Sequence, residues 1–223
     1  MGSISATPRI DQMTPRRLEI AVFGTGSFLR TEAQFGIVRG IWKTAVGYAG
    51  VKSAGLPDRS GQNSIETVRV EYDPIAISYG QLLEMFLVWE ADVAARAEAA
   101  SSPPENSLCI FIRNEFEKRM AQAAVERYRL RDEKLPHVHI AAYKTFHMAP
   151  NLCQKHFLRT LHWLMKDLQS FYSDEAGFVH STLTMRLNGI VGQVLPFTRF
   201  PEDVEFYDLQ DDTVCHLKEY LVS

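Results

Sequence analysis

The chain has 223 residues, 46% of them hydrophobic, and a formal net charge of -3. This is enough apolar material for one substantial core, and the charge gives no electrostatic case for a nucleic-acid partner, so none is expected. No apolar run approaches the roughly 18 residues that a membrane-spanning helix needs, so no membrane partner is expected.

Apolar or alternating runs predict the strands. Leu18–Phe23 is mostly apolar and ends at a glycine, which is typical of a buried strand. Ile65–Tyr72 alternates strictly, so that Glu66 and Val68 would face the same side. The predicted strands are 18–23, 41–48, 65–72, 108–112 and 137–142.

Helical periodicity predicts helices between and after these strands. The predicted helices are 28–37, a helix from Ser78 to about 91, 114–130, 152–171 and 181–191. The segments 51–63 and 94–105 are predicted loops, because they are rich in Gly, Ser, Pro or Ala. This order predicts an α+β fold with a mixed sheet flanked by helices in a single domain.

The first strand is joined to the first long helix by Gly24-Thr25-Gly26-Ser27. A dinucleotide fingerprint would need glycine where Leu29 stands. A hydrolase nucleophile elbow would need glycines at positions 25 and 29, and a phosphate-binding loop would need a Gly-Lys-Ser/Thr ending. The stretch fits none of these, and no cofactor-binding motif is predicted.

The same stretch resembles the active-site signature of the A-type methionine sulfoxide reductases, Gly-Cys-Phe-Trp followed by Glu. Ser27 stands at the cysteine position and Leu29 at the tryptophan position, with Gly26, Phe28 and Glu32 in register. Further motifs follow in the family's order over roughly residues 18–160. They are Gly47-Tyr48-Ala49-Gly50 (GYxGG), residues 66–74 (ExVxVxYDP), residues 77–86 (ISYxxLLxxF) and, loosely, residues 146–157.

The resemblance implies the α/β roll of that family. On this basis we expect a disordered or extended N-terminus (1–17), a reductase-like domain (18–170) and a helical C-terminal extension packed on it (171–223). A plant group of the family also carries Gly-Ser-Phe at this point and a Leu-Asn-Gly motif. Leu187-Asn188-Gly189 is similar to the latter, so the chain resembles that group most.

The resemblance also implies two catalytic residues. A residue that opens a helix lies among free backbone amides, which in the family favour an attacking thiolate; Ser27 lies at that position. Glu66 matches the glutamate that protonates the departing oxygen. The alternative for Glu66 is a strand glutamate in an ion pair with Arg69 or Arg39.

Phe28, Leu29 and Tyr48 match positions that would line the substrate pocket. Phe28 retains part of the family's aromatic grip, although it is also compatible with an ordinary core position. Leu29 removes an aromatic wall, and "ARAEAASSPPENS" replaces a polar segment of the family. The pocket is therefore remodelled and more apolar, which argues against an engineered cysteine-to-serine trap.

Three separated cysteines without a CxxC pair favour a reduced, cytoplasmic setting. Cys109 lies in a predicted buried strand, Cys215 lies near the C-terminus, and Cys153, beside Lys155, is the best remaining thiolate candidate. No metal site is predicted. The alternative would use the histidines at 137 and 139, or those at 156 and 162.

Three functions follow from these residues. The first is a repurposed non-redox acid/base enzyme, an isomerase, cyclase or hydrolase, that acts on a small apolar metabolite. The second is a non-catalytic binder of methionine sulfoxide or a peptide, and the third is a reductase that uses a variant route. The sequence selects neither the substrate nor the oligomeric state.

Overall fold

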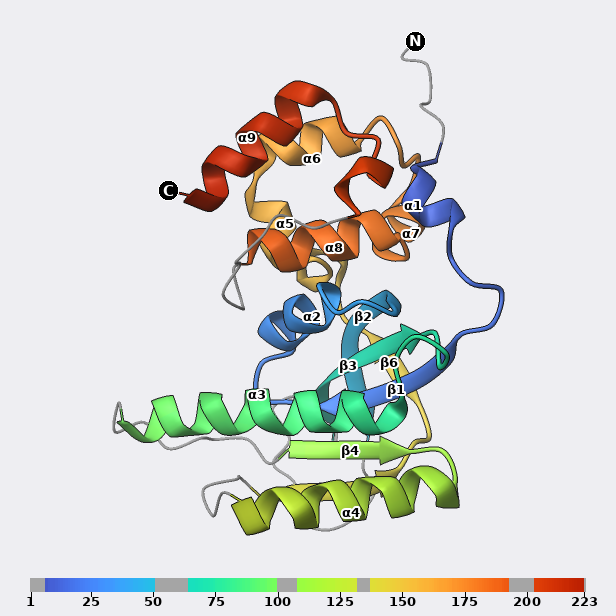
Figure 1. Ribbon diagram of the computed structural model, residues 1–223, viewed down its shortest axis with the longest axis vertical. Coiled ribbons are helices and arrows are strands. Elements are labelled where there is room, and N and C mark those ends of the chain that lie inside the picture. Colours follow the sequence, from blue (N-terminus) through green and yellow to red (C-terminus); the bar gives the residue numbers. More distant parts are fainter. Residues whose placement is uncertain (1–6, 51–63, 100–107, 132–136, 193–202, 223) are drawn as a thin grey trace.

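The computed structural model describes residues 7–50, 64–99, 108–131, 137–192 and 203–222 (Figure 1). The predicted loop 51–63 and the last part of the predicted loop 94–105 lie outside these residues. A six-stranded sheet has the order β5-β4-β1-β3-β2-β6. Only β4 and β5 pair in parallel, so the sheet is mixed, as predicted. The strands are β1 Glu19–Gly24, β2 Ile41–Gly50, β3 Ser64–Tyr72, β4 Leu108–Ile112, β5 Val138–Ala142 and β6 Phe146–Met148.

The sheet is curled into a roll. Strands β5 and β6 form its opposite edges, yet only residues 143–145 join them. Five strand spacings would separate the edges of a flat sheet by about 24 Å. The chain from Ala142 to Phe146 can span only about 14 Å. The edges must therefore approach each other, and the predicted α/β roll is confirmed.

Helices cover one face of the roll and form a separate layer beyond it (Figure 1). Strands β1–β5 and the helices α2, α4 and α8 were predicted within a few residues, whereas α1, β6 and α7 were not. The helices are α1 Arg9–Gln12, α2 Phe28–Gly36, α3 Tyr79–Ala99, α4 Glu115–Arg131, α5 His156–Thr160, α6 His162–Leu168, α7 Glu175–Val179, α8 Thr182–Val191 and α9 Asp211–Val222, with 3-10 turns η1 Asn151–Cys153 and η2 Val204–Phe206.

Three predicted boundaries differ from the structure. Helix α1 lies where a disordered or extended N-terminus was predicted, because Ile10 is buried among the C-terminal helices. Helix α3 continues to Ala99, into the predicted loop, because its Ala-rich end favours a helix. The predicted helix 152–171 is divided, since Lys155 adopts a left-handed conformation with φ 52° and Leu161 is non-helical.

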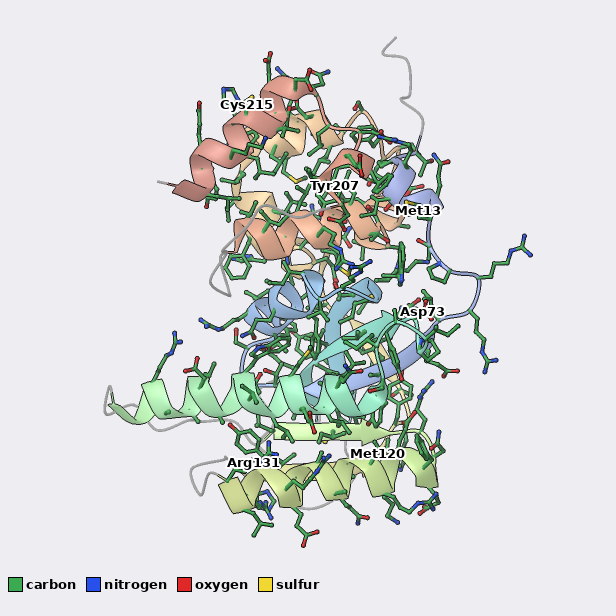
Figure 2. All side chains as sticks on the ribbon, viewed as in Figure 1. Met13, Asp73, Met120, Arg131, Tyr207 and Cys215 are labelled. Carbon is green, nitrogen blue, oxygen red and sulfur yellow. The ribbon has the colours of Figure 1, made fainter. Side chains whose placement is uncertain are left out.

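Two large hydrophobic clusters hold these layers. The first lies between the sheet and the helices α2, α3 and α4, and includes Phe23, Phe35 and Phe86. The second gathers α1 and the C-terminal helices around Leu187 and Tyr207. Figure 2 shows Tyr207 within this helical part, and Cys215 on α9 at its outer end. A smaller cluster, which includes Cys109 and Phe111, fills the other face of the sheet.

The helical C-terminal region packs directly on α2. A Cβ atom on Gly189 of α8 would lie 2.5 Å from the Ala33 carbonyl oxygen, so the two helices approach closely where Gly189 stands. The Arg186 guanidinium donates to the carbonyl oxygens of Gly36 at 2.6 Å and Val38 at 2.9 Å. These carbonyls lie at the end of α2, where a helix leaves acceptors without partners and a positive charge is favourable.

Candidate functional site

The turn between β1 and α2 exposes Ser27 at the helix N-terminus. Ser27 has an extended backbone (φ -148°, ψ 97°), and the helix begins at Phe28. The Ser27 side chain is exposed and makes no capping hydrogen bond. The predicted strand-to-helix junction is confirmed. The Ser27 hydroxyl is exposed to solvent at this junction and does not cap the helix.

The Glu66 carboxylate lies at this helix N-terminus. Phe28 N–H donates to Glu66 Oε2 at 3.2 Å, and Thr25 N–H donates to the Glu66 carbonyl oxygen at 2.9 Å. Glu66 thus supplies the acceptor that Ser27 does not provide, in the place where a helix N-terminus favours negative charge. Arg69, the alternative partner considered from the sequence, instead contacts Glu71 at 3.0 Å.

Aromatic rings lie beside this carboxylate. Tyr48 pairs with Glu66 in the β2–β3 ladder, and its ring centroid lies 5.8 Å from that of the buried Phe28. Leu29 is half-buried against the same core. Burial raises the pKa of Tyr48, and the charges of Cys153 and Glu66 raise it further. The structure therefore places Phe28, Tyr48 and Glu66 next to one another at the turn that carries Ser27, with Cys153 near Tyr48.

Two buried side chains fix the position of Cys153. The Gln154 side chain accepts from Val46 N–H at 2.9 Å and donates to the Val46 carbonyl at 2.7 Å, two residues before Tyr48 on β2. Lys155 follows and is fully buried. The sequence named Cys153 as the best remaining thiolate candidate but could not place it near Tyr48, because that distance depends on how residues 151–155 dock on β2.

Lys155 and Glu32 form a buried ion pair that the sequence did not reveal. Lys155 Nζ donates to Glu32 Oε1 at 2.6 Å and to the carbonyl and hydroxyl oxygens of Thr44 at 2.8 and 3.1 Å. The three ammonium protons thus each have an acceptor. Burial lowers the pKa of Lys155, while Glu32 opposes that shift. The pair ties α2 to the segment that carries Cys153.

A second buried carboxyl lies behind the Ser27 turn. Glu90 Oε1, from α3, accepts from the hydroxyls of Thr25 at 2.6 Å and Thr31 at 2.9 Å. Ser27 N–H in turn lies 3.4 Å from the Thr25 hydroxyl. Burial raises the pKa of Glu90. An isolated polar residue on a helix gives no sequence signal for such a network.

The other cysteines do not join the site. Cys109 is buried in the sheet, and burial raises its pKa to about 12. Cys215 is exposed on α9, well separated from α2 in Figure 2. Among the residues that the structure describes, no three His, Cys, Asp or Glu side chains gather as metal ligands. In the same part of the chain no helix is long and apolar enough to cross a membrane.

The sequence of the chain is similar to that of a known protein family. Residues 19–176 match the family model described as peptide methionine sulfoxide reductase. The chain belongs to this family. It is 32% identical over 184 residues to peptide methionine sulfoxide reductase A5 of Arabidopsis thaliana, with 81% of this chain and 71% of that protein covered. It is 29% identical over 191 residues to a peptide methionine sulfoxide reductase of Drosophila melanogaster, with 83% and 73% covered.

A solved structure supports the fold. Methionine sulfoxide reductase A of Corynebacterium diphtheriae matches with a TM-score of 0.51 and 18% sequence identity, and covers 70% of this chain and 82% of that one. At this identity the likeness concerns the fold, and a fold alone does not assign an activity. The peptide methionine sulfoxide reductase family thus supplies the scaffold, and the chemistry depends on the residues at the α2 N-terminus.

Proposed function

We propose that this member of the peptide methionine sulfoxide reductase family is a non-redox acid/base enzyme that acts on a small, mostly apolar molecule. The observation that carries the proposal is the Glu66 carboxylate held at the α2 N-terminus beside Ser27. Isomerisation, cyclisation and hydrolysis are the reaction types that one carboxyl group and one hydroxyl group can promote together.

Glu66 is the proposed general acid and base. Its carboxylate is fixed by the Phe28 amide, and a positioned carboxyl group transfers protons to and from a substrate within hydrogen-bond reach. Because that amide already donates to Glu66, the Ser27 hydroxyl is the donor proposed to stabilise negative charge that develops on the substrate.

The walls of the site favour an apolar substrate. The partly buried Tyr48 ring packs against the buried Phe28 ring, and Leu29 is a partly buried aliphatic side chain on the same helix as Phe28. The raised pKa of Tyr48 keeps its phenol protonated at neutral pH, so it is available as a hydrogen-bond donor. We infer a substrate with an apolar body and one polar group directed at Glu66.

Ser27 also disfavours the thiol chemistry that the relatives' names imply. A serine hydroxyl is far less acidic than a thiol, and oxygen transfer to it would give a peroxide-like product. We therefore expect negligible reduction of methionine sulfoxide with dithiothreitol, and at most weak activity in Ser27→Cys. If Ser27→Cys reduced methionine sulfoxide as fast as other members of the family, the pocket would still be suited to the sulfoxide.

The experiment compares wild-type protein, Glu66→Gln and Glu71→Gln after incubation with a small-molecule extract, with mass spectrometry as the readout. Glu71 is the matched control, because it lies on the same strand and pairs with Arg69. We expect a metabolite that is isomerised, cyclised or hydrolysed by wild type and by Glu71→Gln but not by Glu66→Gln. Identical extracts after all three incubations would reject the enzyme, and retention of a metabolite without turnover would indicate a binder.

One observation favours a second candidate, a reductase in which Cys153 replaces the missing thiol. The Gln154 side chain, next to Cys153, is hydrogen-bonded to Val46, two residues before Tyr48, which places Cys153 beside the strand that carries Tyr48. In this route the Cys153 thiolate attacks the sulfur of a methyl sulfoxide, and Glu66 protonates the departing oxygen. The oxygen leaves as water, and a water molecule then attacks the Cys153 sulfur, which breaks the new sulfur–sulfur bond, releases the thioether and leaves Cys153 as a sulfenic acid. An external dithiol returns the sulfenic acid to the thiol with release of water and a disulfide.

The two candidates make opposite predictions for two variants. The thiol route requires dithiothreitol-dependent sulfoxide turnover that is lost in Cys153→Ser and kept in Ser27→Ala. The acid/base proposal predicts no such turnover in wild type, and sulfoxide turnover lost only with Ser27→Ala would contradict both.

A further inference from the structure

Two histidines lie side by side at an edge of the sheet, apart from the Glu66 site. His139 lies within β5 and pairs with Cys109 of β4, and the His137 carbonyl accepts from Leu108 N–H at 3.2 Å. Residues two apart on a strand point to the same face. Their ring centroids are 4.3 Å apart, and His137 Nδ1 lies 3.2 Å from His139 Nε2.

We propose that His137 and His139 form a binding site for a divalent first-row transition cation of the Zn²⁺, Ni²⁺ or Cu²⁺ type. Imidazole nitrogen is a preferred ligand of these ions, and Mg²⁺ and Ca²⁺ prefer oxygen. The acid/base or redox chemistry at Glu66 does not involve these residues, so the site is independent of the proposed function.

The separation of the two nitrogens fits one cation. A zinc ion bonds to imidazole nitrogen at about 2.0–2.1 Å, so an ion bound to both nitrogens at their present separation would subtend an angle of about 100°. This angle lies between the tetrahedral and octahedral values. The backbone contacts of both residues with β4 fix their positions along the sheet edge, so only side-chain rotation is needed to direct both nitrogens at one ion.

Both rings are accessible from solvent. His137 is exposed, and His139 is partly exposed. The hydrogen bond between the rings uses one proton, and a neutral imidazole can carry that proton on its other nitrogen instead. Replacing this hydrogen bond by two metal bonds therefore releases no proton.

With only two protein ligands, the site would bind a cation weakly, and water would complete the coordination. In the described part of the chain no third His, Cys, Asp or Glu joins the pair, so water would fill the remaining positions. An ion bound to residues two apart requires an extended strand. Binding therefore favours the β5 conformation and adds to the stability of the fold through linkage.

The test is isothermal titration of the metal-stripped full chain with ZnCl₂ and, separately, with MgCl₂. We expect about one Zn²⁺ per chain, a rise in Tm with Zn²⁺, and no response to Mg²⁺. His137→Gln and His139→Gln should each weaken Zn²⁺ binding at least about tenfold and remove the Tm shift, since each leaves a single ligand.

His147→Gln is the matched control, because His147 is an exposed histidine on the opposite edge strand. It should bind Zn²⁺ as wild type does. Wild-type protein without a Zn²⁺ response, equal binding of Mg²⁺, or unchanged affinity in both His137→Gln and His139→Gln would overturn the proposal. The last result would point to Cys215 and its neighbour His216 instead. His137 precedes the strand, so His137→Gln keeps the test interpretable if His139→Gln fails to fold.

Discussion

The Glu90 carboxyl controls the turn that presents Ser27. It accepts from the hydroxyls of Thr25 and Thr31, which lie on either side of Ser27 in the sequence. Burial raises the pKa of Glu90 above its ordinary value. A carboxyl with a raised folded pKa favours folding while it is protonated, so its contribution to stability falls as pH rises from about 4.3 through the folded pKa.

Glu90→Gln should therefore be neutral or stabilising at pH 8 and should lose that advantage toward pH 4.5. The amide oxygen still accepts from both threonines, and the cost of a buried charge is gone. Urea unfolding at the two pH values measures the difference. Glu84→Gln, at an exposed position of the same helix, should show no such pH dependence. A clear loss of stability in Glu90→Gln at pH 8 would show that the ionised carboxylate is required.

The residues of the Arg186-Leu187-Asn188-Gly189 motif each have a structural role. Arg186 donates to the end of α2, the Asn188 side-chain oxygen accepts from Leu158 N–H at 3.1 Å, and Gly189 allows the close approach to Ala33. Leu187 is fully buried in the helical cluster. The motif thus joins the C-terminal helices to α2 and does not take part in the chemistry at its other end.

At the level of elements, the contact between α2 and α8 depends on the absence of side chains. Gly189 faces the Ala33 carbonyl, and Gly36 faces the Met185 carbonyl, where an added Cβ would lie at 2.5 and 2.6 Å. A backbone carbonyl cannot rotate away as a side chain can. The two helices would have to separate, and α2 carries the Ser27 turn at its other end.

Gly189→Ala should therefore destabilise the protein by about 1–3 kcal/mol, the usual cost of overpacking a core. Thermal unfolding measures the change. Gly177→Ala is the control, because its Cβ would meet Asp174 at an ordinary 3.4 Å and alanine is favourable at this exposed position of helix α7. Equal Tm values for Gly189→Ala and wild type would contradict the close packing of α2 and α8.

At the scale of the whole molecule, the N-terminal helix α1 packs on the C-terminal helices. Asp11, on α1, accepts from the N–H groups of Thr182 at 2.7 Å and Leu183 at 3.0 Å, which open α8. The same carboxylate accepts from the Tyr172 hydroxyl at 2.9 Å. The N-terminal helix is thus part of the C-terminal layer (Figure 1).

Asp11→Ala should lower the free energy of unfolding by about 1–3 kcal/mol, because it removes a helix cap and leaves buried donors without an acceptor. Urea unfolding followed by circular dichroism is the measurement, and Arg16→Ala, at an exposed position, is the control. If Asp11→Ala and Arg16→Ala unfolded at the same urea concentration as wild type, α1 would not stabilise the helical layer.

Local sequence patterns were sufficient to predict most of the strands of the roll. Strands β1 to β5 and the Ser27 junction follow from apolar runs, alternation and glycines that lie within a few residues of each other. Strand β6 was missed because three residues, two of them exposed, carry no periodic pattern. The predicted helix 152–171 was wrong because its local pattern gave no sign that Lys155 turns inward to reach Glu32.

The sequence by itself determined the order of the elements, the face of β3 on which Glu66 lies and the presence of Ser27 at a helix N-terminus, since each depends on backbone preferences of neighbouring residues. Only the tertiary structure decided which distant groups share a site. Glu32 and Lys155 are 123 residues apart in the chain, and Val46 and Gln154 are 108 apart. A buried charge or amide must find its partner wherever the fold supplies one, and that requirement placed Cys153 beside Tyr48 and Glu90 beneath Ser27.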